Sequence, residues 1–188
     1  MRRLYSLPVV TLAVVAMAGL LVPHLRPVEA GNKQADGPTS KYVGAAGCKF
    51  CHQGRAGGQI YEGWQATDHA KAFEHLSEAD RDNDQCLACH TTGFGEPIAA
   101  GVAAASLQGV QCEACHGPGS EYKKISIMKD RHLAMSLGLV APSEAVCRSC
   151  HTASLPKECW AGTDAQPRFD FKSAYEKIEH HIPEKSRR

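Results

Sequence analysis

The chain has 188 residues, and its 21 lysine and arginine residues nearly balance its 20 aspartate and glutamate residues. This near-neutral charge argues against a nucleic-acid-binding protein, because such proteins need a clustered basic surface. Aromatic residues make up only 6% of the chain. The length suits one domain, but a core built from side chains alone would be thin.

The first 30 residues have the features of an export signal. Two arginines precede an apolar run that ends near Val22, and Ala30 is a small residue suited to signal peptidase. The run is shorter than the roughly 20 residues that a membrane-spanning helix needs. An uncleaved membrane anchor is the alternative. We expect residues 1–30 to be a Sec-type signal peptide and residues 31–188 to be one exported domain, with no membrane span after cleavage.

Eight of the nine cysteines fall into four copies of one motif, C-x-x-C-H. The copies are Cys48, Cys51 and His52; Cys86, Cys89 and His90; Cys112, Cys115 and His116; and Cys147, Cys150 and His151. Four copies, each with its histidine directly after the second cysteine, are not accidental.

The spacing of this motif matches covalent attachment of c-type haem. Cysteines three residues apart share one face of a helical turn, so both thiols reach the two vinyl groups of one haem. The following histidine then becomes the proximal ligand of the iron. Structural zinc sites also use C-x-x-C pairs, but without a systematic histidine after each pair. Disulfides are the other alternative for an exported chain. The motifs therefore predict four haems, short helices at the attachment sites and a core formed largely by the porphyrins.

The remaining histidines are candidates for the distal side of the irons. His69 lies in EGWQATDHAKAFEHLSEADRDN, residues 62–83, where the apolar residues are spaced as in a helix. His75 would face another direction on that helix, and we interpret it as a surface residue. Further along the chain, Gly117-Pro118-Gly119 predicts a turn that ends the third attachment helix.

Two later segments carry the other candidates. His132 lies in an amphipathic segment, IMKDRHLAMSLGLV, where its pattern fits a ligand and a surface residue equally well. His180 and His181 end a second predicted helix, DFKSAYEKIEHH, and either of them is a candidate ligand. Cys159 stands outside the motifs, as a spare residue or as one half of an intermolecular disulfide.

These residues resemble the multihaem cytochromes of the c-554 type. The stretches that carry the resemblance are YVGAAGCKFCH, WQATDHAKAF, CLACHTTGFG, GVQCEACHGPGSEY and FDFKSAYEKIEH. The resemblance implies a mainly α-helical fold with much irregular loop, whose core is formed by four covalently bound haem c groups, some of them stacked in parallel pairs.

The resemblance also implies three haems with two histidine ligands and one without a protein ligand on its distal side. Carried onto this sequence, it assigns His69 to the third haem, His180 to the first and His132 to the fourth. The second haem, on His90, would then be open on one side.

Electron transfer between redox partners of a respiratory chain is the function that this pattern favours. We expect a non-enzymatic protein in the periplasm or outside the cell. Its partners would be a periplasmic oxidoreductase or a membrane quinol dehydrogenase. One alternative is reduction of nitric oxide, nitrite or hydroxylamine at the haem on His90. Another is a subunit of an extracellular haem filament, which would be a homo-oligomer.

Overall fold

The computed structural model describes residues 40–152, 159 and 169–180. The chain divides into two units, residues 1–33 and 34–188, and all described residues belong to the second unit. The predicted signal peptide and His181 lie outside the described residues. No helix in the described part is long and apolar enough to cross a membrane.

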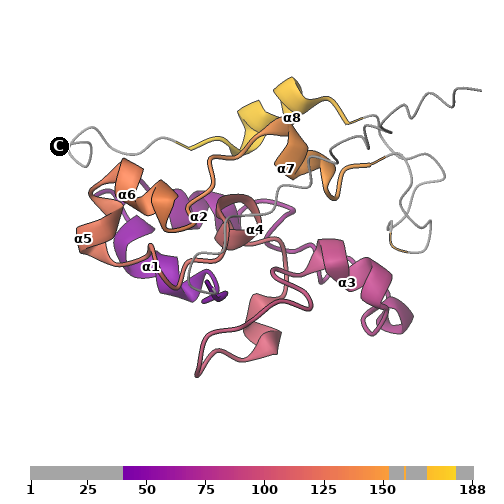
Figure 1. Ribbon diagram of the computed structural model, residues 1–188. Coiled ribbons are helices and arrows are strands. Elements are labelled where there is room, and N and C mark those ends of the chain that lie inside the picture. Colours follow the sequence, from indigo (N-terminus) through magenta and orange to yellow (C-terminus); the bar gives the residue numbers. More distant parts are fainter. Residues whose placement is uncertain (1–39, 153–158, 160–168, 181–188) are drawn as a thin grey trace, which may run out of the picture. The chain divides into compact units, whose positions relative to one another are not determined.

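Short helices joined by irregular segments make up the described part of the chain (Figure 1). The α-helices are α1 (Ala46–His52), α2 (Ile60–Gln65), α3 (Asp84–His90), α4 (Cys112–His116), α5 (Ile125–Met128), α6 (Arg131–Ser136), α7 (Glu144–Arg148) and α8 (Phe171–Ile178). Two 3-10 helices, η1 (Glu78–Asp80) and η2 (Ala104–Leu107), complete the set. The described β-structure consists of isolated bridges, Tyr42 with Ile98 and Thr91 with Gln108. The predicted mainly α-helical fold with much loop is therefore confirmed.

The helix expected around His69 is shorter than predicted, because α2 ends at Gln65 and His69 lies in a series of turns. The backbone explains the difference. The carbonyl of His69 accepts a hydrogen bond from the backbone N–H of Val110 at 2.8 Å. Gly109 approaches so closely that a Cβ on it would lie 2.5 Å from the carbonyl oxygen of Ala70. Around His69, turns and a bond to the segment before α4 thus take the place of regular α-helical hydrogen bonds.

The helix expected before the paired histidines is present as α8, but it ends at Ile178. Asp170 begins it, because its side chain accepts a hydrogen bond from the backbone N–H of Ser173. Glu179 is already extended, so His180 follows the helix rather than lying on it. His132 lies on α6, where Asp130 is the capping residue.

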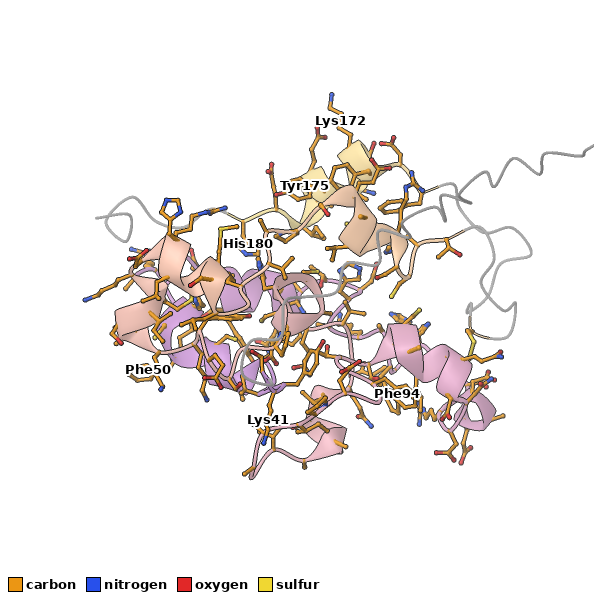
Figure 2. The ribbon with its side chains drawn as sticks, viewed as in Figure 1. Lys41, Phe50, Phe94, Lys172, Tyr175 and His180 are labelled. Atoms are coloured by element: carbon orange, nitrogen blue, oxygen red, sulfur yellow. A yellow bond between two sulfur atoms is a disulfide. The ribbon has the colours of Figure 1, made fainter. Side chains whose placement is uncertain are left out.

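The buried side chains are few and mostly small. Those that are both buried and apolar are Val43, Ala45, Leu76, Cys86, Leu107, Tyr122, Ala134 and Cys159. Phe50, by contrast, is 86% exposed on α1, between the two cysteines of the first motif (Figure 2). The described residues therefore form a thin core, as the composition predicts.

Candidate haem-attachment site

Three of the four motifs occupy the carboxyl-terminal end of a short helix. α1, α3 and α4 each end on the motif histidine, and the residue that follows leaves the helix. After α4 that residue is Gly117, whose φ of 76° is readily adopted only by glycine. The predicted end of the third attachment helix is thus confirmed, but residues 117–119 are irregular and do not form the predicted turn. The fourth motif begins in α7 and finishes in a turn, where the N–H of His151 still bonds to the carbonyl of Cys147 at 2.9 Å.

The thiols of different motifs lie beside one another. Cys48 of the first motif donates a hydrogen bond to Cys112 of the third. This bond raises the pKa of Cys48 and lowers the pKa of Cys112. The first and third attachment points are therefore neighbours in space although 64 residues separate these cysteines in the sequence.

The second and fourth motifs meet in the same way. Burial, followed by a hydrogen bond with Cys150, raises the pKa of Cys89 to about 12. Burial also raises the pKa of Cys115 to about 11, and the nearby Cys147 and Cys150 add to this. All four attachment sites thus belong to one cluster.

A cavity of about 210 Å³ opens between the second and fourth motifs. Its lining includes both Cys89 and Cys150, together with Tyr42, Phe94 and Glu96. Two motif thiols and two aromatic rings border this space, and thiols beside aromatic rings are the chemistry that covalent attachment of a porphyrin edge needs. The residues present therefore fit the group.

Two proximal histidines are oriented by distant backbone carbonyls. The Nδ1–H of His90 donates to the carbonyl of Ala72 at 2.6 Å, and that of His116 donates to the carbonyl of Val140 at 3.1 Å. A bond at Nδ1 leaves Nε2 free as the metal ligand and holds the ring in one orientation. Burial also lowers the pKa of His116, which keeps the imidazole in the neutral form that binds a metal.

Two pairs of histidine rings from distant parts of the sequence lie next to each other. The ring centroids of His69 and His151 are 5.9 Å apart, and those of His116 and His180 are 5.8 Å apart. Imidazole nitrogens bond metal ions at roughly 2 Å, so two imidazoles on opposite sides of one ion have centroids about 6 Å apart. Both separations match this arrangement.

These pairs differ from the ligand assignment that the family resemblance implies. His69 was expected on the third haem but faces the histidine of the fourth. His180 was expected on the first haem, yet its ring contacts His116 of the third. It also lies close enough to His52 to lower the pKa of that histidine, after the larger effect of burial.

The other candidates lie apart from the described histidine rings. His132 is exposed on α6 and His75 is exposed in the turns before η1. The surface location predicted for His75 is confirmed. For His132, no ring contact with another described histidine supports its expected place on the fourth haem.

Phe169 packs on the proximal histidine of the fourth motif. Its ring stacks on that of His151, with centroids 4.5 Å apart and an angle of 11° between the planes. The guanidinium of Arg148 lies 5.4 Å from the Phe169 ring and is itself paired with Glu144 at 2.6 Å. Phe169 therefore limits the rotation of the His151 ring.

Cys86 forms a bond that the sequence did not predict. Its sulfur is joined to that of Cys159 in a disulfide. A sulfur in a disulfide cannot also form a thioether, so this bond differs from the expected attachment of haem at Cys86. The other seven cysteines are free thiols.

Glu113, between the two cysteines of the third motif, has a structural role at the site that the C-x-x-C-H pattern does not predict. It is 1% exposed, and its carboxylate accepts backbone hydrogen bonds from Val43, Gly44 and Gly119 at 2.6–3.1 Å. It thereby ties the chain before α1 to the loop after α4. The sequence feature that could have indicated this role is the acidic residue within the stretch GVQCEACHGPG.

Known proteins share these features. Residues 47–117 match the family model described as cytochrome c554 and c-prime. Cytochrome c-554 of Nitrosomonas europaea is 30% identical over 125 residues, which cover 56% of this chain and 49% of that protein. The chain thus spans about half the length of this curated relative.

A solved structure is also similar. The reduced state of cytochrome c554 from Nitrosomonas europaea matches with a TM-score of 0.53 at 22% identity, over 77% of this chain and 86% of that one. This likeness shows the fold. Covalently bound haem c is the cofactor that the family implies. The family model, the curated relative and the solved structure are all cytochromes of the c-554 type, and this chain is similar to them.

Proposed function

We propose that this protein is an exported tetrahaem c-type cytochrome that carries electrons between redox partners of a respiratory chain. The observation that supports this most directly is the meeting of thiols from different motifs, Cys48 with Cys112 and Cys89 with Cys150. Attachment points that touch would hold their haems at close range. Close spacing is what one-electron transfer along a chain of centres requires.

The motif residues would hold the cofactors: the cysteines as thioethers and His52, His90, His116 and His151 as proximal ligands. When bound, haem supplies an iron that gains and loses one electron. The chain's own part is to orient each imidazole, exclude water from its faces and keep the ligands in place. The carbonyls of Ala72 and Val140 orient the imidazole rings of two of the motif histidines.

For the distal ligands we propose His69 on the fourth haem and His180 on the third, in agreement with the ring separations. His132 then remains as the candidate for the first haem.

The partner would be another redox protein in the periplasm or outside the cell. Contacts between redox proteins are small and transient, so one exposed haem edge suffices. The first motif suits this role, because Cys51 and Phe50 are both exposed on α1 (Figure 2). The export signal predicted in residues 1–30 supports the location.

Reduction of a small ligand at the haem on His90 is the second candidate function. Among the described residues, no other histidine ring contacts that of His90, and its Nδ1 is occupied by a backbone carbonyl. An iron without a distal side chain is open to a small molecule such as nitric oxide. The alternative therefore depends on one iron, whereas electron transfer uses all four.

A redox titration of the purified holoprotein, followed by visible and electron paramagnetic resonance spectroscopy, tests the proposal. We expect four reducing equivalents per chain, three low-spin signals and one high-spin signal. Rapid reoxidation by a second cytochrome, without consumption of nitrite or nitric oxide, supports electron transfer. Fewer than four equivalents would contradict the tetrahaem assignment. Steady turnover of nitric oxide or nitrite would favour the second candidate.

A further inference from the structure

Cys159 is the one cysteine outside the four motifs, and the function proposed above gives it no role. It is bonded to Cys86, the first cysteine of the second motif, across 73 residues of sequence. The same Cys86 sulfur is needed for a thioether to the second haem. The two bonds exclude each other.

The bridge is enclosed. Cys86 is 0% exposed and Cys159 is 5% exposed, and both pack against Leu76, with Phe73 and Leu87 around them. Cys89, three residues after Cys86, instead lines the cavity shared with Cys150. The second motif therefore directs its two sulfurs to different surroundings, one to a disulfide and the other to the haem pocket.

Among the described motif cysteines, only Cys86 forms a disulfide. Each cysteine of the first, third and fourth motifs is a free thiol, although Cys48 lies within hydrogen-bonding distance of Cys112. A general tendency of neighbouring thiols to pair would have joined these as well. Only the second motif is blocked.

We propose that Cys159 is a redox gate for the second haem-attachment site: its disulfide with Cys86 withholds that site until a dithiol protein reduces the bridge. This inference rests on the proposed function, since it requires that the motifs attach haem. In this proposal, Cys159 protects the Cys86 thiol before haem is attached. In an oxidising compartment, an unpaired cysteine would otherwise react with other proteins.

The chemistry balances with partners of the thiol–disulfide exchange class. The bridge forms when the two thiols pass two electrons and two protons to a protein disulfide, which becomes a dithiol. To open it, a thiolate of a dithiol protein attacks the Cys159 sulfur, the S–S bond breaks, and Cys86 leaves as a thiolate that takes up a proton. The second thiolate of the donor then attacks the mixed disulfide and releases Cys159, and the donor ends as a disulfide.

The Cys86 thiol is then able to add to a vinyl group. The sulfur bonds one vinyl carbon and the proton goes to its neighbour, so this step involves no net oxidation or reduction. Because both sulfurs are buried, opening of the bridge requires local unfolding around the Leu76 cluster. Reduction of the bridge, rather than addition to the vinyl group, would then set the pace of attachment at this motif.

The test uses the full chain produced in a bacterium that attaches c-type haem, with and without an overproduced thiol-disulfide oxidase. Mass spectrometry of peptides measures haem occupancy at each motif and detects the Cys86–Cys159 linkage. With extra oxidase we expect the second motif of the native chain to lose occupancy several-fold more than the other three. In Cys159→Ser, occupancy at the second motif should equal that of the others under both conditions.

Leu76→Ala is a second variant, because it loosens the same cluster without changing a thiol. It should open the bridge more readily, so with extra oxidase its second motif should lose less occupancy than that of the native chain. If Cys159→Ser fails to accumulate, intact-mass analysis of the native protein decides: its three-haem molecules should carry the bridge and its four-haem molecules should not.

Equal occupancy at all four motifs in the native chain with extra oxidase, or a four-haem protein that keeps the bridge, overturns the gate alone. A chain that attaches haem at none of its motifs overturns the proposed function instead.

Discussion

Glu113 shows how a single buried side chain connects two of the motifs. Its carboxylate accepts the N–H groups of Val43 and Gly44, which precede α1, and that of Gly119, which follows α4. Buried backbone donors need partners, and here three of them share one side chain. The first and third motifs are held together by this carboxylate as well as by the contact of Cys48 with Cys112.

Replacing Glu113 by glutamine should destabilise the protein by about 1–3 kcal/mol, because an amide NH₂ would face an N–H donor and leave it without an acceptor. The guanidinium chloride midpoint of the holoprotein measures this change. Glu74→Gln, at an exposed site, should leave the midpoint unchanged. Equal midpoints for the two variants would show that Glu113 contributes no more than a surface carboxylate.

At the scale of elements, the turns that follow α2 determine which residues lie beside the histidines of the other motifs. They bring His69 opposite His151, while Ala72 faces His90. The His69 carbonyl accepts the N–H of Ala72 within a turn and the N–H of Val110 from the segment before α4. This segment is therefore shaped by contacts with α3 and the chain before α4.

His69→Ala should convert one low-spin haem to high spin, because it removes a distal imidazole. Phe169→Ala should shift the g-values of the same signal, because Phe169 limits the rotation of the His151 ring on that iron. Electron paramagnetic resonance of the oxidised protein measures both effects.

His75→Ala is the control for this pair and should leave every signal unchanged, since His75 is exposed. If His69→Ala and Phe169→Ala alter two different low-spin signals, His69 is not a ligand of the fourth haem. The third haem, to which the family resemblance assigns His69, would then be its site.

The sequence was sufficient for the local chemistry and insufficient for the pairing. C-x-x-C-H depends on neighbours within one helical turn, so its spacing was enough to predict the anchors, and the short helices predicted at them are present. The partner of His69 depends on a contact between segments some 80 residues apart, and no periodic pattern records such a contact. Cys159 illustrates the same limit, because its partner Cys86 already had a role from its motif.

At the scale of the whole molecule, the small number of buried apolar residues is the dominant fact. Side chains such as Ala45 and Ala134 bury little area, and the stabilisation from apolar burial is proportional to that area. The few buried apolar residues of the described part need further apolar surface to pack against. In the proposed function, the faces of the porphyrins supply that surface.

The haem-free chain should accordingly show no cooperative thermal unfolding, whereas the holoprotein should show a clear transition. Far-ultraviolet circular dichroism during heating compares the two forms. The haem-free chain is measured with and without a reductant, and the Cys86–Cys159 bridge by itself should not restore the transition. A sharp transition in the haem-free chain would mean that the side-chain core is sufficient.

The hydrogen bond from His90 to the carbonyl of Ala72 has a consequence for how such a protein changes over time. Ala72 lies three residues after His69, so one short stretch of chain touches the ligands of two different motifs. In the proposed function, a substitution in this stretch would alter two centres at once, so their midpoint potentials would change together. Changes at this stretch would therefore come in pairs rather than singly.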